Sequence, residues 1–314
     1  MTELQRYLAE EVAEDHVDGI ITRREAIRRL GLLGVGATAA SAMLAAEAAA
    51  KKGGGPGHGH RHGSDGRETS WAPVPAQDIT FAGPRGPLLA AYAQAAQPRG
   101  GVLVIHENRG LTAHIRNVAE RFAASGWSAL ALDLLSEEGG TRTFPDEAAV
   151  TAALSRIAPE RFDADMKAAL TELDRRVWRK PLAAIGFCFG GGMVWRLLAS
   201  RERRLAAAAP FYGPFPANAN LNGTKADVLA VYGGLDARVN ASIPVAKAAL
   251  EAARLDYELL MFTQADHAFF NDTGARFNVP AAEEAWRRVI GWFDDAADGR
   301  GHGRGHGHGH GKDD

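Results

Sequence analysis

Residues 182–198 read LAAIGFCFGGGMVWRLL, an apolar run, a glycine-rich turn and a second apolar run. The first run predicts a short buried strand and the second an apolar helix. Cys188 lies between Gly186 and Gly190 with one residue on each side, which is the spacing of a nucleophile elbow with cysteine in place of serine. Side chains at the two flanks would collide with the turn or with a neighbouring strand, so glycine is expected there. The helix dipole at this position favours the thiolate of Cys188.

Two residues further along the chain are candidate partners of Cys188. Asp236 and His267 each follow a predicted strand, and the order nucleophile, acid, histidine is the one that nucleophile-elbow enzymes use. Asp236 would orient His267 through one ring nitrogen while the other faces the sulfur. Asp266 is a competing acid, but its adjacency to His267 predicts that its side chain points elsewhere. The alternative is an inert buried cysteine, a turn-forming aspartate and a structural histidine.

Around this stretch, residues 74–298 alternate short apolar runs with segments of helical periodicity. The predicted strands are 88–93, 102–106, 128–132, 182–187, 205–211, 228–232 and 257–262. Helical periodicity is clearest at residues 115–123, 245–252 and 285–293. Strands that alternate with helices build parallel sheets covered on both faces, so the sequence predicts an α/β fold with a mainly parallel sheet.

A fourth chemical feature follows the predicted strand 102–106. Glu107 and Asn108 lie in the loop from which this kind of fold takes one backbone amide of an oxyanion hole, and Phe189 would supply the second amide. His106 and Glu107 are placed where a charge could reach the sulfur.

The motifs HENRG (106–110), GFCFGG (186–191), GGLD (233–236) and DHAF (266–269) together resemble the dienelactone hydrolase family, over about residues 78–296. The resemblance implies an α/β-hydrolase fold with an eight-stranded sheet and helices on both faces. It implies an ester or lactone hydrolase of the carboxymethylenebutenolidase type, with no cofactor and no metal ion. By resemblance, the site residues are the nucleophile Cys188, the base His267, its orienting acid Asp236, the carboxylate Glu107 that contacts the resting thiol, and the backbone amides of Asn108 and Phe189.

The sequence departs from the family at Asn271, where enzymes that act on dienelactone carry an arginine for its carboxylate. Asparagine would compensate a substrate carboxylate poorly, which argues against dienelactone itself but not against hydrolase chemistry. Arg109 and Arg142 could supply a charge, but we expect both to be solvated surface residues. We also expect Glu107 to lie outside the core.

Residues 1–50 resemble a twin-arginine export signal. Arg23 and Arg24 precede residues 31–46, an uncharged stretch rich in alanine and glycine. We therefore expect recognition by the twin-arginine machinery and a periplasmic or extracellular location, with a membrane anchor if the signal is retained. The alternatives are a plain N-terminal anchor or a helix packed on the domain. Membrane contact is expected only through this segment.

Composition excludes several classes of protein. The net charge of −2 argues against nucleic-acid binding, and a single cysteine excludes an internal disulfide. The Gly/His-rich segments 51–73 and 299–314 are predicted to be a linker and a disordered tail. Their histidines leave one rival function, a secreted metal-binding or adhesion protein on a catalytically inert hydrolase scaffold.

Overall fold

The computed structural model describes residues 1–52 and 74–300. Their contacts divide them into two compact units. Residues 1–52 belong to one unit together with the insert Phe144–Ile157, and residues 74–143 and 158–300 belong to the other. The histidines of the Gly/His-rich segments lie outside the described residues, so the linker, the tail and the rival function stay predictions.

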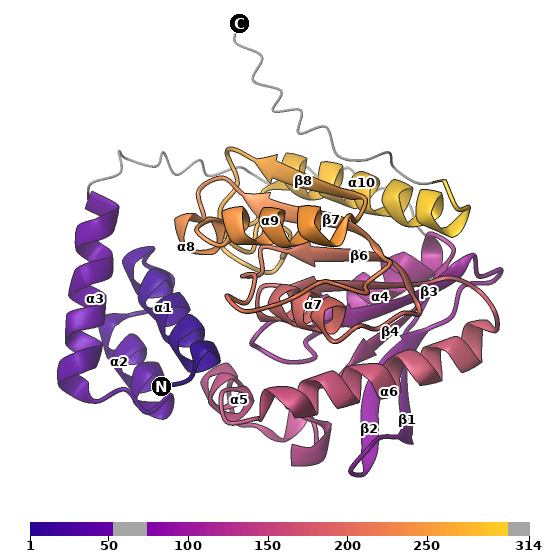
Figure 1. Cartoon of the computed structure of the whole chain (residues 1–314). Coiled ribbons are helices and arrows are strands. Elements are labelled where there is room, and N and C mark those ends of the chain that lie inside the picture. The colour runs from indigo at the N-terminus through magenta and orange to yellow at the C-terminus, as the bar shows by residue number, and fades with distance from the viewer. Residues whose placement is uncertain (53–73, 301–314) are drawn as a thin grey trace, which may run out of the picture. The chain divides into compact units, whose positions relative to one another are not determined.

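The larger unit is built on an eight-stranded sheet (Figure 1). Its strands are β1 (Gln77–Ala82), β2 (Pro87–Ala93), β3 (Gly100–Ile105), β4 (Trp127–Leu132), β5 (Leu182–Phe187), β6 (Leu205–Phe211), β7 (Asp227–Gly233) and β8 (Tyr257–Phe262). The spatial order is β1-β2-β4-β3-β5-β6-β7-β8. Only β2 runs antiparallel to its neighbours β1 and β4, and all other pairs are parallel. The prediction of a mainly parallel sheet is confirmed.

Helices cover both faces of this sheet (Figure 1). They are α4 (Ala113–Ala124), α6 (Pro159–Val177), α7 (Phe189–Ala199), α8 (Ala237–Asn240), α9 (Ile243–Ala253) and α10 (Val279–Ala297), with short 3-10 turns at Ser136–Glu138 and Thr141–Thr143. Phe122 of α4 packs against Trp286 and Phe293 of α10, with ring centroids 4.6 and 6.0 Å apart. These two helices share one face, while α6 and α7 contact each other on the opposite face.

The seven predicted strands are all present, three with the predicted bounds and four with ends shifted by one or two residues. The strand predicted to reach His106 ends at Ile105, which leaves His106 in the loop. The seven apolar runs did not include β1, because Gln77–Ala82 alternates polar and apolar residues at the edge of the sheet.

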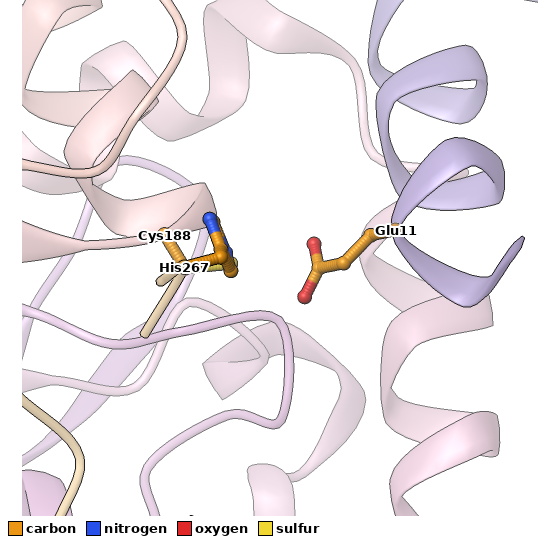
Figure 2. Close-up of side chains that lie close together, drawn as sticks. All are labelled: Glu11, Cys188 and His267. Atoms are coloured by element: carbon orange, nitrogen blue, oxygen red, sulfur yellow. The ribbon is translucent and has the colours of Figure 1, made fainter. Parts of the chain in front are cut away.

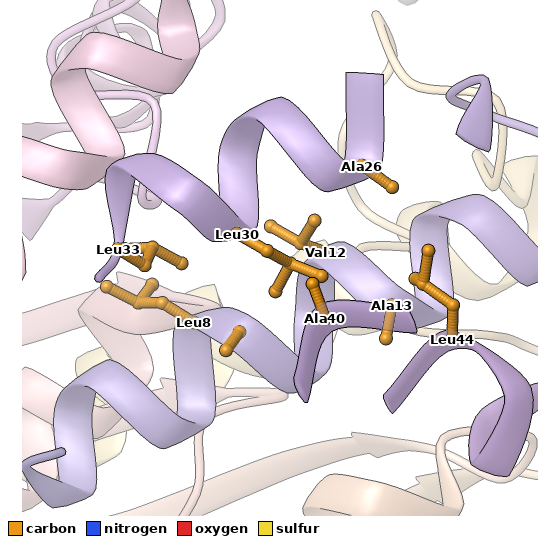
Figure 3. Close-up of a cluster of buried hydrophobic side chains, with 9 residues drawn as sticks. Leu8, Val12, Ala13, Ala26, Leu30, Leu33, Ala40 and Leu44 are labelled. Atoms are coloured by element: carbon orange, nitrogen blue, oxygen red, sulfur yellow. The ribbon is translucent and has the colours of Figure 1, made fainter. Parts of the chain in front are cut away.

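The smaller unit is helical, with α1 (Glu3–Val17), α2 (Arg23–Leu32), α3 (Ala37–Lys52) and α5 (Glu147–Leu154). Thr2 and Thr22 cap α1 and α2 through their side-chain oxygens. Apolar side chains of α1, α2, the residue that follows α2, and α3 form a small core (Figure 3), which consists of Leu8, Ala9, Val12, Ala13, Ala26, Leu30, Leu33, Ala40 and Leu44. Across the described residues, no helix combines the length and the apolar character that a bilayer span requires.

Candidate active site

The loops that follow five parallel strands lie together at the carboxyl-terminal end of the sheet. Glu107 follows β3, Cys188 follows β5, Tyr212 follows β6, Asp236 follows β7 and His267 follows β8. These strands are parallel neighbours in the order β3-β5-β6-β7-β8, so their carboxyl ends lie on the same side. That edge is where α/β sheets place their ligand sites.

Cys188 occupies a sharp turn between β5 and α7. Its backbone has φ 56° and ψ −119°, a strained conformation for a residue with a side chain. A Cβ on Gly186 would lie 2.1 Å from the carbonyl oxygen of Gly190, and one on Gly190 would lie 2.4 Å from the carbonyl oxygen of Ile105. The predicted need for glycine at both flanks is therefore confirmed.

Cys188, His267 and Asp236 lie together. Nδ1 of His267 is 2.6 Å from Oδ2 of Asp236. The sulfur of Cys188 and a ring nitrogen of His267 are within 4.8 Å of each other, and Figure 2 shows the two side chains adjacent. Nε2 of His267 has no hydrogen-bond partner of nitrogen or oxygen among the described residues, so it is the ring nitrogen available to the sulfur.

The charges of His267 and Asp236 shift each other's pKa in the direction that favours both ionised forms. Burial lowers the pKa of His267, but the negative charges of Asp236 and Cys188, and hydrogen bonds with both, raise it well above its ordinary value of 6.5. Burial raises the pKa of Asp236, yet the charge and the hydrogen bond of His267 bring it below its ordinary value. The arrangement favours the protonated form of the His267 imidazole beside the Asp236 carboxylate.

Asp266 does not compete for the ring of His267. Its Oδ1 accepts a hydrogen bond from the backbone N–H of His267 at 2.7 Å, and its Oδ2 lies 3.9 Å from Nε of Arg276. This agrees with the prediction that the Asp266 side chain points elsewhere.

His106 binds backbone groups and stays uncharged. Nε2 accepts a hydrogen bond from the backbone N–H of Leu134 at 3.1 Å, so Nδ1 carries the proton and donates to the carbonyl oxygen of Glu107 at 2.6 Å. Burial lowers the pKa of His106. The sequence-based suggestion that its charge could reach the sulfur is wrong. His106 instead holds the loop that carries Glu107 and Asn108.

Glu107 is buried, with 5 % of its surface exposed. The expectation that it lies outside the core is therefore wrong, because the loop after β3 folds into the site. Its Oε2 accepts a hydrogen bond from Nδ2 of Asn271 at 2.7 Å. Asn271 thus contacts Glu107 at the position where an arginine was expected.

The two predicted oxyanion residues lie on different elements. Asn108 is buried in the loop after β3, and Phe189 is the first residue of α7. Backbone N–H groups in the first turn of a helix have no acceptor within that helix, so they can bind an anion.

Tyr212 is a site residue that the sequence analysis missed. It is fully buried with φ 34°, and its ring meets the ring of His267 edge-on with centroids 5.3 Å apart. Burial raises the pKa of Tyr212 well above its ordinary value, and the charges of Glu107 and Cys188 raise it further. The hydroxyl therefore remains protonated. The available signal was a tyrosine directly after a predicted strand and before Gly213.

The two candidate arginines differ from each other. Arg142 is a surface residue with 69 % of its side chain exposed and an ion pair to Asp78 at 3.0 Å, as expected. Arg109 is half-buried rather than solvated.

Comparisons with known proteins agree with this geometry. The model of the dienelactone hydrolase family matches residues 88–297. A candidate carboxymethylenebutenolidase of Escherichia coli O157:H7 is 31 % identical over 216 residues, which cover 64 % of this chain and 78 % of the relative. A second candidate carboxymethylenebutenolidase, from Saccharolobus solfataricus, is 29 % identical over 236 residues, which cover 64 % of this chain and 91 % of the relative. The crystal structure of a candidate dienelactone hydrolase from Klebsiella pneumoniae superposes with a TM-score of 0.62 at 27 % identity, covering 69 % of this chain and 97 % of that one.

Proposed function

This chain belongs to the dienelactone hydrolase family and is an ester or lactone hydrolase, and we propose that it works through a thioester on Cys188. In the first step, the thiolate attacks the carbonyl carbon of the substrate. The backbone amides of Asn108 and Phe189 hold the resulting oxyanion. When the intermediate collapses, His267 gives its proton to the departing alkoxide, and the acyl group stays on the sulfur.

Water completes the cycle. His267, now neutral, takes a proton from a water molecule as the water oxygen attacks the thioester carbonyl. When this second intermediate collapses, the bond to Cys188 breaks and the sulfur leaves as the thiolate. Asp236 keeps the imidazole in the orientation that both steps need. Esters and lactones suit this site better than amides, because an amine is a poorer leaving group and demands a better placed acid.

The observation that carries the proposal is the meeting of three features at one sulfur. Cys188 lies at the apex of a strained turn, a buried imidazole lies against it, and the pKa of that imidazole is raised by the neighbouring charges. A cysteine that served only as a core residue would need neither the turn nor the ion pair.

The test is to trap the acyl-enzyme. We would mix the full chain with p-nitrophenyl acetate, quench in acid within the burst of p-nitrophenolate, and map the acetyl group by peptide mass spectrometry. Acetyl on Cys188, removed by hydroxylamine, is the expected result. Protein alkylated beforehand with iodoacetamide serves as the control and should give no burst. A burst whose acetyl group maps to another residue would contradict the proposal.

We propose in addition that Glu107 takes the thiol proton as substrate binds, so that the sulfur becomes nucleophilic in the complex. Its burial supports this role, because a carboxylate withdrawn from water is a stronger base. Its hydrogen bond to Asn271 holds the carboxylate in place.

We also propose that the chain is exported by the twin-arginine route. The support is the Arg23-Arg24 pair, which precedes an uncharged stretch rich in alanine and glycine. The two arginines open α2, and the apolar residues that follow contribute to the small helical core.

A further inference from the structure

Exposed basic residues lie along the amino-terminal end of the sheet. The strands β5, β6, β7 and β8 are parallel neighbours, so the segments that precede them lie together at the end opposite Cys188. Each of these segments carries at least one exposed basic residue within four positions of its strand: Arg179, Lys180, Arg201, Arg203, Lys225 and Arg254. Neighbouring strands are about 4.8 Å apart, so the residues form a row about 15 Å long. We call these six residues the basic rim.

Ion pairs do not neutralise the basic rim. Within the part of the chain that the structure describes, none of its six residues forms an ion pair, whereas Arg204 beside it binds Glu202 at 2.6 Å. The acidic residues near the same end are either half-buried (Asp174, Asp227 and Asp256) or paired with other basic residues (Glu172, Glu202, Glu251, Asp294, Asp295 and Asp298). The exposed charge at this end of the sheet is therefore positive.

A large apolar side chain stands beside these charges. Trp178 directly follows α6, and 70 % of its surface is exposed. The guanidinium carbon of Arg179 lies 5.5 Å from the centroid of the indole ring, so a cation and an aromatic ring share one exposed turn. Tryptophan flanked by lysine and arginine is typical of protein surfaces that meet the boundary between lipid and water.

The backbone at this end takes a conformation that glycine adopts more easily. The connection between α6 and β5 consists of residues 178–181, and Trp178 and Arg179 have φ of 39° and 57°. Arg201 after α7 and Arg254 after α9 have φ of 59° and 56°. Glycine reaches such values without strain, whereas each of these four residues carries a large side chain. The turns therefore explain the backbone but not the choice of a tryptophan and three arginines.

Helix dipoles account for only part of this composition. The crossover helices run against the strands, so α6, α7 and α9 end at the amino-terminal end of the sheet, and their negative carboxyl termini favour the arginines of the three turns. Lys180 and Lys225 lie next to strands instead, two residues before β5 and β7. Trp178 has no charge for a dipole to attract. The surface as a whole needs a partner that is both anionic and able to take up an indole ring.

We propose that the basic rim, together with Trp178, docks on the surface of an anionic lipid bilayer. The basic side chains contact lipid phosphates, and the indole enters the headgroup layer. Because the net charge of the whole chain is −2, the positive end also orients the molecule on a negative surface. Cys188 lies at the opposite end of the strands, so docking leaves it open to substrate. The sequence analysis expected membrane contact only through residues 1–50, and this surface belongs to the larger unit.

The test is co-sedimentation of the full chain with phosphatidylcholine vesicles that either contain or lack phosphatidylglycerol. The wild type should bind the anionic vesicles at low salt and be largely released at high salt, because salt screens exposed charges. The double variant Arg179→Gln/Lys180→Gln should lower the partition coefficient about tenfold or more, since each basic residue near an anionic surface contributes to binding. Trp178→Ala should remove most of the binding that persists at high salt, because the indole contributes through burial rather than charge.

Matched variants control for charge and for aromatic surface. Arg142→Gln/Arg287→Gln removes two charges from arginines with 69 % and 71 % of their side chains exposed, and neither residue belongs to the basic rim. Phe277→Ala removes an exposed aromatic ring from the loop after β8, at the catalytic end. Both should bind vesicles like the wild type. Every variant keeps residues 1–50, so a difference between variants cannot come from that segment.

Thermal melts and turnover of p-nitrophenyl acetate show whether the variants of the basic rim and Trp178 are folded, and both should match the wild type. Equal vesicle binding by these variants and the wild type would overturn the proposal. Retention on heparin that depends on the same residues, without binding to anionic vesicles, would overturn it as well and identify an acidic macromolecule as the partner. Neither result bears on the thioester mechanism, which the trapping of the acyl-enzyme tests separately.

Discussion

Oδ2 of Asp236 lies 2.6 Å from Nδ1 of His267, and both side chains are withdrawn from solvent. The contact joins the loop after β7 to the loop after β8, and it leaves Nε2 of His267 for the sulfur of Cys188. The tautomer and the direction of the imidazole therefore depend on one carboxylate.

The first prediction concerns that carboxylate. Asp236→Asn should lower turnover of p-nitrophenyl butyrate by about 1,000-fold or more, because an amide no longer stabilises the imidazolium and can select the wrong tautomer. Steady-state kcat would be measured beside a circular dichroism spectrum. Asp266→Asn is the matched control, since Asp266 does not bind the ring, and it should retain most of the activity. Equal losses in the two variants would argue against Asp236 as the orienting acid.

The second prediction is a pH dependence of stability. The pKa of His267 is raised in the folded chain, so its contribution is fully present below about 6.5 and is lost as the pH rises through the folded value. The pKa of Asp236 is lowered, so its contribution is present above about 3.8 and is lost as the pH falls. The difference in melting temperature between wild type and Asp236→Asn should therefore be largest between these two values and shrink toward alkaline pH. Thermal melts across this range measure it, and a difference that grew at alkaline pH would contradict the ion pair.

The third prediction concerns Cys188. Cys188→Ala should abolish ester hydrolysis while the fold stays nearly intact, because alanine fits the same strained turn with a smaller side chain. Cys188→Ser should keep little activity, since a hydroxyl in a site built for a thiolate is a far weaker nucleophile. Turnover and thermal melts of both variants would be compared. Wild-type turnover in Cys188→Ala would refute the mechanism.

The fourth prediction concerns export. Changing Arg23 and Arg24 together to lysine should leave the protein in the cytoplasm, because the machinery reads the arginine pair rather than its charge. Fractionation of the expressing cells measures the outcome. Arg28 and Arg29 form a second arginine pair in the same helix, so their replacement by lysine is the control that should not alter export. Unchanged fractionation of the Arg23/Arg24 variant would contradict export by this route.

Much of the sheet was readable from the sequence, because parallel strands are buried on both faces and appear as continuous apolar runs. The turn at Cys188 could be predicted as well, because its two flanking positions require glycine. A Cβ on Gly186 would collide with Gly190, and a Cβ on Gly190 would collide with the end of β3. The edge strand β1 could not be predicted in this way, because its residues are not uniformly buried and do not form a continuous apolar run.

The contacts between loops could not be predicted in the same way. Glu107 and Asn271 are 164 positions apart in the sequence, and neither motif contains a pattern that predicts a hydrogen bond between the two side chains. The burial of Glu107 and the position of Tyr212 depend on how five loops fold over one another. Sequence reasoning placed the residues at the correct edge of the sheet but could not assign their hydrogen bonds.

The last prediction concerns Glu107, whose proposed role is to take the proton of the Cys188 thiol. Glu107→Gln has nearly the same shape, and its carbonyl oxygen can still accept the hydrogen bond from Asn271. We therefore expect the free energy of unfolding to change by no more than about 1 kcal/mol, although the residue is buried. Turnover should nevertheless fall substantially, because an amide cannot take up a proton at neutral pH.

The measurement pairs kcat on p-nitrophenyl butyrate with a thermal melt for the wild type and Glu107→Gln. Glu107→Ala is the second variant, because it removes the acceptor as well as the charge, and it should lose both stability and turnover. If the carboxylate served only to hold the loop through Asn271, glutamine would substitute for it and alanine would not. Full activity in Glu107→Gln would thus remove Glu107 from the chemistry and leave Cys188, His267 and Asp236 to act without it. Low turnover in a variant that melts like the wild type would instead require the charge of Glu107 for the reaction itself.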